Sequence, residues 1–290
     1  MLKDTKANKV FLIVLVVILG LVFTVVRGCD LSSGGRRADQ SVEFTSTDSL
    51  KVSTIANDII IECDPKATRA SISVGNSDKD LLRVVKSSSQ VSVDIKPKTS
   101  WFFRFFSYRP SNLVITLPTS SLHNLEVSSI SGNIRLLQAI DANMVKISST
   151  SGEIDLLDVM TNSNLRLITI SGKISSRVLD CAGDLELKST SGNLEVQKIQ
   201  AATSKLTSIS GSIEAEVSLL EGGSLEAGST SGSVNLDLRN SKDLALTASS
   251  TSGSIMFNDQ EMPKRATTST GSEKHPVRLS SVSGSINVTY

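Results

Sequence analysis

Serine residues recur at a fixed spacing through the second half of the chain, and a serine hydroxyl can act as a nucleophile when a base activates it. Beyond residue 119 a Ser-Gly pair appears eight times, mostly 19 to 21 residues apart. No pair has the G-x-S-x-G pattern of a nucleophile elbow, and neither His123 nor His275 stands beside one. We therefore interpret these serines as structural and predict no catalytic residue. The pairs begin at Ser131, Ser151, Ser171, Ser191, Ser210, Ser231, Ser252 and Ser283.

Acidic side chains are the second group that could do chemistry, because glycoside hydrolases work with a pair of carboxylates. A polysaccharide lyase or hydrolase on a β-helix would need acids that converge on one face. The acids of the repeats are instead spread along the chain, which is typical of a solvated surface. A polysaccharide-active enzyme is the least favoured hypothesis. The acids concerned are Asp155, Asp158, Glu195, Glu214, Glu216 and Asp237.

Metal and cofactor chemistry have little support in the sequence. Cys63 and Cys181 lie far apart, no C-x-x-C motif is present, and no ligand cluster surrounds either histidine. A structural zinc site needs four such ligands at suitable spacing, so we expect no metal site and no cofactor. The two cysteines are interpreted as small buried hydrophobic residues. A disulfide bond between them has no support in the spacing.

Aromatic residues are concentrated in one short segment of a chain that is only 4% aromatic. The segment "WFFRFFSYRP", residues 101–110, holds the only tryptophan and four of the eight phenylalanines. Two interpretations stay open: a hydrophobic plug over an end of the fold, or an exposed loop that contacts a membrane or a partner. The candidate contact residues are Trp101, Phe102, Phe103, Arg104, Phe105, Phe106, Tyr108 and Arg109.

The N-terminal segment predicts a membrane anchor. Lysines within residues 1–9 precede an apolar run at residues 10–26, which reaches the lower length limit of a transmembrane helix. Basic residues before the run favour a cytoplasmic N-terminus and an extracytoplasmic remainder, in the periplasm or at the cell surface. Residues 27–41 are polar and glycine-rich, which is typical of a flexible linker.

Cys29 offers an alternative anchor. It follows Gly28 directly after the apolar run, which resembles a bacterial lipoprotein cleavage site, although Arg27 departs from that pattern. Either the segment is an uncleaved signal anchor or Cys29 is acylated. Both interpretations tether the chain to a membrane.

The elements that carry the Ser-Gly pairs show the period of two residues that is typical of half-buried strands. Apolar residues mostly stand four and six positions before each serine and three positions after it, while residues such as Glu126 and Lys146 alternate with them. The glycine would form the corner between two strands, where we expect a positive φ. Stacked coils would let the Ser and Thr hydroxyls bond to one another or to the next coil's backbone. The pattern predicts an all-β, β-solenoid or β-helix-like stack of ~20-residue repeats.

The two ends of this stack are less regular. Residues 42–118 lack the Ser-Gly period and are interpreted as a β region that caps the first open edge, ahead of the repeats at 119–290. The last interval between pairs, which includes residues 262–276, predicts an irregular coil or a bulging loop. No cap is visible after it, so the neighbourhood of Tyr290 is a candidate docking edge.

One detail of the repeats has no explanation at this level. The residue before each Ser-Gly serine nearly alternates between isoleucine and threonine, but the series ends with Thr230, Thr251 and Val282. If successive repeats face different neighbours, the true unit is two repeats, and the sequence alone does not decide this.

The passage "NLVITLPTSSLHNLEVSSISGNIRL", residues 112–136, resembles the bacterial β-strand-repeat family DUF4097, whose members are called adhesins largely because of their architecture. The resemblance covers roughly residues 42–290. It implies a β-solenoid-like domain that is often membrane-attached and exported, and it brings no catalytic residues.

The leading hypothesis is a non-enzymatic, membrane-tethered protein of the bacterial cell envelope whose repeat surface binds an unknown protein or glycan. With 30 basic and 29 acidic residues, nothing in the charge predicts a nucleic-acid partner. The alternative is an envelope scaffold or stress-response component that self-associates through the solenoid ends. A signalling role would need a partner, because residues 1–9 are too short to form an output domain.

Overall fold

The computed structural model describes residues 39–75, 80–97 and 112–290, and these residues are all-β. The prediction of an all-β repeat fold is confirmed. None of the described residues belongs to a helix that is long and apolar enough to cross a membrane. The predicted anchor at residues 10–26 lies outside the described residues, as does the linker up to residue 38.

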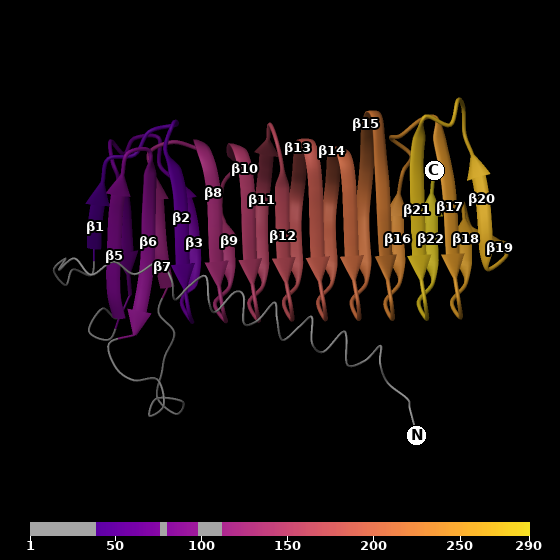
Figure 1. Ribbon diagram of the computed structural model, residues 1–290, viewed down its shortest axis with the longest axis horizontal. Coiled ribbons are helices and arrows are strands. Elements are labelled where there is room, and N and C mark those ends of the chain that lie inside the picture. The colour runs from indigo at the N-terminus through magenta and orange to yellow at the C-terminus, as the bar shows by residue number, and fades with distance from the viewer. Residues whose placement is uncertain (1–38, 76–79, 98–111) are drawn as a thin grey trace, which may run out of the picture. The chain divides into compact units, whose positions relative to one another are not determined.

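The described strands belong to one continuous sheet that is wound into coils. In each coil an entry strand runs toward one edge of the stack and an exit strand leaves that edge, and in the coils other than β6–β7 a tight corner joins the two strands (Figure 1). We call the line of corners the corner edge. The entry strands are β2 (Ser49–Thr54), β6 (Gln90–Pro97), β8 (Ser121–Ser129), β10 (Ile140–Ser149), β12 (Leu165–Thr169), β17 (Leu244–Ser250) and β21 (His275–Ser281). The exit strands are β3 (Asp58–Cys63), β7 (Asn112–Leu117), β9 (Ile134–Leu136), β11 (Ile154–Thr161), β16 (Val234–Asp237), β18 (Ile255–Phe257) and β22 (Ile286–Thr289).

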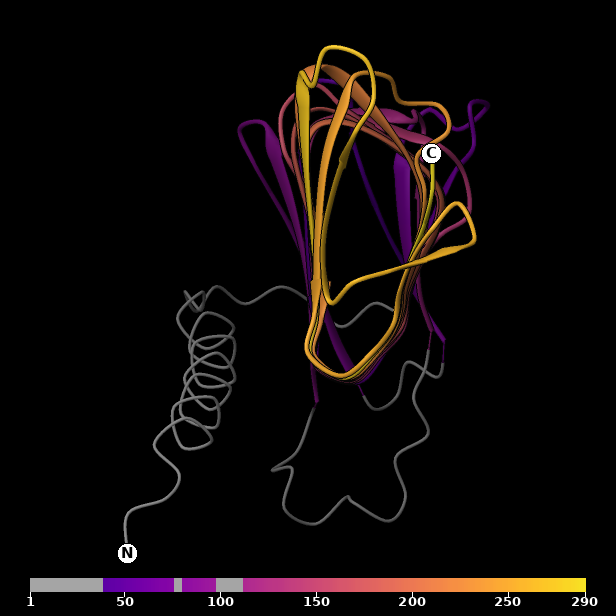
Figure 2. The same ribbon diagram turned by 90° about the vertical axis from the view of Figure 1, so that its right-hand side faces the viewer.

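Three longer strands leave one corner, bend, and return to the next. They are β13 (Ile174–Ser189), β14 (Leu194–Ser208) and β15 (Ile213–Ser229). In Figure 2 the coils lie behind one another, each narrow at the corner edge and wider at the opposite edge. Five further strands run antiparallel at the two ends: β1 (Asp39–Val42), β4 (Ala70–Val74), β5 (Asp80–Ser87), β19 (Gln260–Met262) and β20 (Arg265–Ser269).

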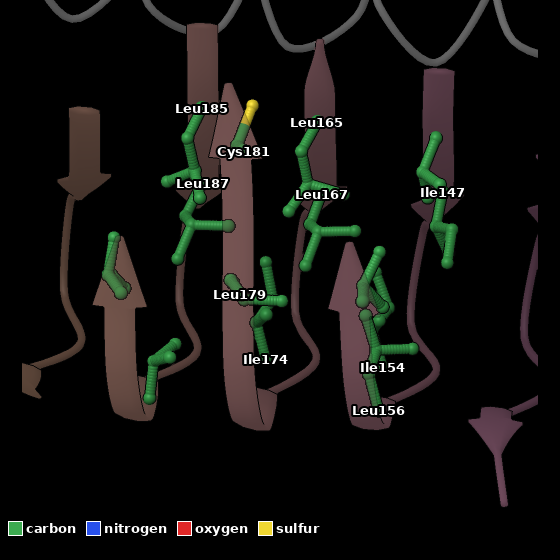
Figure 3. Packing of buried hydrophobic residues seen from close by; sticks show 14 of the residues in the cluster. Ile147, Ile154, Leu156, Leu165, Leu167, Ile174, Leu179, Cys181, Leu185 and Leu187 are labelled. Atoms are coloured by element: carbon green, nitrogen blue, oxygen red, sulfur yellow. The ribbon is translucent and has the colours of Figure 1, made fainter. Parts of the chain in front are cut away.

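Neighbouring coils pair in parallel and in register, so equivalent residues of successive repeats lie side by side. Ile147 pairs with Leu167, which in turn pairs with Leu187. All three side chains are fully buried, and they point into the space between the entry and exit strands (Figure 3). The period of two residues follows directly, because alternate side chains of a strand face opposite sides.

The last coils do not stack in the order of the sequence. Strand β21 pairs with β15 on one side and with β17 on the other, and β22 likewise lies between β16 and β18. The coil β21–β22 is therefore inserted inside the stack, although it follows β17–β18 in the chain. The expectation of an uncapped docking edge at Tyr290 is wrong, because β17–β18 and not β22 forms the outermost parallel layer.

The other end shows the same kind of reordering. Strand β2 pairs with β6 and β8, and β3 pairs with β7 and β9. The coil β2–β3 is thus an inner layer in register with the Ser-Gly coils, and its corner runs from Thr54 to Asn57 without a Ser-Gly pair. Residues 42–118 therefore hold two parallel layers in addition to antiparallel strands.

Antiparallel strands close the end of the stack that holds β6–β7. Strand β5 covers β6, while β4 and then β1 cover β7. Phe44 is buried in the core there. The Asp48 carboxylate, 5% exposed, accepts a hydrogen bond from Lys86 at 3.0 Å and one from the Thr45 N–H at 2.9 Å. Burial raises the pKa of Asp48, but the Lys86 and Thr45 hydrogen bonds together hold it below its usual value.

The opposite end is closed by a hairpin and a crossing segment, where the sequence predicted an irregular coil. Strand β19 pairs with β18, the chain crosses the end of the stack, and β20 then pairs with β17 (Figure 2). Lys264 lies in the crossing segment and donates hydrogen bonds to the carbonyl oxygens of Ser252 and Gly253. Tyr290 packs edge-to-face on Phe257 and bonds to Thr268 Oγ1 at 3.3 Å.

The corner glycines have a different role from the one expected. Among the described glycines only Gly222 and Gly271 have a positive φ, so the expectation of positive φ at the Ser-Gly corners is wrong. Glycine is needed there because the corners stack in close contact. A Cβ at Gly172 would overlap the carbonyl oxygen of Gly152, and a Cβ at Gly192 would overlap that of Gly172.

We predict that Gly172→Ala destabilises the protein by about 1–3 kcal/mol, because the added Cβ forces two coil backbones apart. The measurement is the free energy of unfolding in urea. Gly75→Ala is the matched control, since a Cβ at Gly75 meets nothing within 4 Å. Equal effects of the two substitutions would contradict the close-approach explanation.

Candidate functional site

A row of buried hydroxyls runs beneath the corner edge. Each belongs to the residue three positions before the corner glycine, as Ser189 does before Gly192. The Ser189 hydroxyl accepts a hydrogen bond from the Gly192 N–H at 2.7 Å and donates one to the Gly172 carbonyl of the neighbouring coil at 3.4 Å. The Gly152, Gly211, Gly232 and Gly284 N–H groups are bonded in the same way by their own coils. The expected hydroxyl-to-backbone bonding is confirmed. These hydroxyls are buried and engaged, so they are not available as nucleophiles.

The outer surface of the corner edge carries two rows of exposed or half-exposed side chains. One row consists of the eight Ser-Gly serines, all exposed. The other consists of the residue before each of them, together with Ile55 at the equivalent position of the β2–β3 corner. Ile55 and Val282 are 39% and 47% exposed. Neither row contains a charged residue. The corner edge is thus a periodic surface of hydroxyl and branched apolar groups.

The order of the coils explains the interrupted alternation along this edge. Ser283 N–H bonds to the Thr230 carbonyl, and Ser252 N–H bonds to the Val282 carbonyl. Val282 therefore lies between Thr230 and Thr251 in space. From Ile130 onward the row alternates without a break between an isoleucine or valine and a threonine.

The histidines do not supply a base to any corner serine. His275 opens β21 at the end remote from its corner, and it is buried with Nδ1 3.1 Å from the Gly223 carbonyl oxygen. His123 lies near the start of β8, also remote from the corner, and is exposed. Both positions agree with the interpretation of the serines as structural.

The acids that a glycosidase would need are instead held in ion pairs or spread between coils. Asp158 pairs with Arg177, and Glu195 pairs with Lys173. The hydrogen bond from Lys173 lowers the pKa of Glu195, and the one from Arg239 lowers the pKa of Asp237. A general acid for glycoside cleavage needs a raised pKa, so these two carboxyls are unsuited to that role.

Entry strands carry a further row of ion pairs between neighbouring coils, away from the corner edge. Glu126 bonds to Lys51 at 3.0 Å and to Lys146 at 3.4 Å, and Arg166 bonds to Glu186 at 3.0 Å. Exposed pairs of this kind contribute little stability individually. In these pairs the charged side chains of neighbouring coils are bonded to one another.

Metal-ligating residues do not gather in the part of the chain that the structure describes, where no group of three such side chains could hold an ion. Cys63 and Cys181 are free thiols in strands that are not neighbours. Cys181 is buried and bonds to the Ser163 carbonyl at 3.1 Å. Burial, with the nearby Glu62 charge, raises the pKa of the partly buried Cys63.

The remaining candidate residues lie outside the described residues: Cys29 in the N-terminal segment, and the aromatic residues Trp101 to Arg109 in the connection between β6 and β7. The ends of that connection are described. Pro97 ends the entry strand β6 and Asn112 begins the exit strand β7.

Comparison with protein families identifies the chain. Residues 47–289 match the model of the family described as Toastrack DUF4097. The chain belongs to this family. The resemblance drawn from residues 112–136 is therefore confirmed, and it extends over nearly all of the described coils.

Several solved structures are similar to this member of the DUF4097 family at low identity. A "putative adhesin" from Bacteroides fragilis is 14% identical, with 86% of this chain and 95% of that chain covered and a TM-score of 0.48. A "putative adhesin" from Parabacteroides distasonis is 9% identical, with 86% and 95% covered and a TM-score of 0.40. A "putative lipid binding protein" from the same species is 14% identical, with 87% and 95% covered and a TM-score of 0.41. No curated protein matches the chain. We draw no ligand from these similarities, since a shared fold does not imply a shared function.

Ser204 is an exception within the core of the stack. Its neighbours in the same interior row are Leu185 and Leu225, and its buried hydroxyl has no hydrogen-bond partner among the described residues. An unpaired buried hydroxyl costs stability. The sequence alone could have revealed this exception, because serine stands at this one repeat where the other repeats have leucine or valine.

We predict opposite effects of one substitution at two serines. Ser204→Ala should raise the free energy of unfolding by about 1 kcal/mol, since it removes an unpaired buried polar group. Ser189→Ala should lower it by about 1–3 kcal/mol, because the buried Gly192 N–H loses its acceptor. Urea unfolding followed by circular dichroism measures both. Effects of the same sign would contradict this account of the hydroxyl row.

Proposed function

We propose that this chain is a membrane-tethered, extracytoplasmic and non-enzymatic binding module of the bacterial cell envelope, whose repeat surface contacts a protein or glycan. The N-terminal apolar run at residues 10–26 supports the tether, with acylation of Cys29 as the alternative attachment. Membership of the DUF4097 family supports the binding role over catalysis.

The single observation that carries this proposal is that the start of β1, the end of β6 and the start of β7 all lie at the corner edge. Strand β1 begins there. Its first residue, Asp39, pairs with Ser73 of β4, and Ser73 pairs in turn with Val114 near the start of β7. Strand β6 ends at the same edge and β7 begins there. The described residues that follow the predicted linker and flank the aromatic segment therefore lie toward the corner edge, at the same end of the stack.

This arrangement favours a contact role for the aromatic segment. A segment that joins the fold beside the linker can reach the membrane to which the linker leads, and tryptophan, phenylalanine and arginine suit the membrane interface. We therefore propose that residues Trp101 to Arg109 contact the membrane surface. The uncharged corner edge is then the periodic surface available to a partner along the rest of the stack.

Non-enzymatic function is supported by the state of the polar groups. The buried hydroxyls beneath the corner edge, such as that of Ser189, are bonded to backbone, and Asp158, Glu195 and Asp237 are bonded to basic side chains. The scaffold alternative, in which copies join end to end, has less support. Antiparallel strands cover both ends of the described stack, and of its exposed large hydrophobic side chains only Val85 of β5 lies on these strands.

Protease accessibility tests the location. We expect a protease added to intact cells, or to cells stripped of their outer layers, to cleave within residues 39–290, while cytoplasmic marker proteins stay intact. Cleavage on intact cells would indicate a surface position, and cleavage only after stripping would indicate a position beneath the outer layers. Protection in both cases, with cleavage only after lysis, would contradict an extracytoplasmic domain.

Trp101 is the only tryptophan in the chain and therefore reports on the aromatic segment alone. In the full chain reconstituted into vesicles of phosphatidylethanolamine and phosphatidylglycerol, we expect brominated lipids to quench its fluorescence, because the indole would lie at the interface. Quenching by aqueous iodide alone would indicate an exposed segment away from the membrane. Resistance to both quenchers would support the buried plug and contradict the contact role.

A further inference from the structure

The coil β21–β22 occupies a slot between two coils that precede it in the chain. Five residues of β21 pair with β15 and seven pair with β17, while β22 pairs with β16 and β18. Backbone hydrogen bonds also hold its corner on both sides, from Ser283 to Thr230 and from Ser252 to Val282. The slot therefore accepts one strand, corner and strand of the repeat, with partners on each face.

Side chains inside the stack make this slot specific for its occupant. Leu279 of β21 pairs with Ala227 on one side and with Ala248 on the other, and all three are buried. Stacking β17 directly on β15 would bring the two alanines together and leave the volume of the leucine unfilled, which is costly in a close-packed core. The slot thus favours β21–β22 over the adjacent repeat.

The segment that leads into this coil is held in a strained conformation. Residues 270–274 connect β20 to β21, and Glu273 has a φ of 57°. This left-handed region is unfavourable for a residue other than glycine. The Asp243 carboxylate secures the segment by accepting hydrogen bonds from the Ser272 N–H at 2.7 Å and the Ser272 hydroxyl at 3.1 Å.

We propose that β21–β22 is an exchangeable coil, and that the partner it fits is the same slot in a second copy of this chain. In the exchanged dimer each copy donates its coil and receives the other's, so every strand pairing and corner hydrogen bond of the slot is made again. Residues 270–274 become extended, and Glu273 leaves its left-handed conformation. Such reciprocal exchange has two-fold symmetry and closes as a dimer.

Exchange of the coil depends neither on membrane tethering nor on the ligand of the repeat surface. It also differs from end-to-end association, because the stack ends keep their antiparallel strands. Opening the coil breaks the Asp243 bonds to Ser272, the contact between His275 and Gly223, and the Tyr290 contacts with Phe257 and Thr268. Exchange therefore requires partial unfolding and should be slow under native conditions.

Cysteine pairing between two full-length variants tests the proposal. One variant carries Thr230→Cys and the other Val282→Cys, each in a background with Cys29, Cys63 and Cys181 replaced by alanine. The two are unfolded together, refolded in detergent at high protein concentration and oxidised. Neighbouring coils are separated by roughly 4.8 Å, which a disulfide can span. We expect a disulfide-linked heterodimer on a non-reducing gel, because residue 282 of one chain lies beside residue 230 of the other.

The matched control mixes Thr230→Cys with Thr251→Cys. In the closed and in the exchanged form both positions stay in the stack of their own copy. Residue 230 of one chain and residue 251 of the other therefore lie in different stacks, which does not hold them within disulfide range. We expect the control to give much less heterodimer. Adding Glu273→Gly to both test variants should lower the yield, since glycine removes the strain that opening relieves. Equal heterodimer yields in the test and the control, or none in either, would overturn the proposal.

Discussion

The stack depends on the contact between a glycine of one corner and a carbonyl of the next. Gly172 fits against the Gly152 carbonyl only because it has no side chain, and the Ser189 hydroxyl binds both its own corner and the corner below. A tight corner leaves backbone groups that cannot pair within their own coil, and a buried unpaired group is costly. The repeated corner answers both needs. Its glycine removes a side chain, and the serine or threonine three positions before that glycine supplies a hydroxyl to backbone groups that would otherwise stay unpaired.

Each coil pairs its backbone hydrogen-bonding groups with those of its neighbours, so the outermost coils would be left with unpaired groups on one side. Edge strands with free backbone groups invite further pairing, and here antiparallel strands cover them at both ends. Lys264 shows the same principle at a single corner. Its ammonium group binds the Gly253 carbonyl, which in an inner coil would receive the hydroxyl of the next corner. Asp48 and Lys86 secure the opposite closure.

Much of this fold could be predicted from local sequence, because strand alternation and corner spacing are local properties. The all-β repeat and the inward-facing rows such as Leu167 and Leu187 follow from period and residue type alone, whereas the family came from the resemblance of residues 112–136. The order of the coils could not be predicted, since every repeat offers its neighbours nearly the same register. The choice depends on non-local packing, as at Ala227, Leu279 and Ala248. The corner at residues 54–57 was missed because it uses Thr54 and Asn57 in place of the Ser-Gly pattern. The contact role of Trp101 to Arg109 stays a prediction.

The out-of-order coils also limit how the length of this protein can change during evolution. From β10 to β14 each repeat contacts only the repeats before and after it in the chain. Duplication or loss of one unit of about 20 residues there would lengthen or shorten the stack by one layer and leave both closures intact. The same event among β16 to β22 would leave a strand pair without a slot, or a slot without a strand pair. The middle of the chain is therefore free to vary in repeat number, while the closures must be inherited whole.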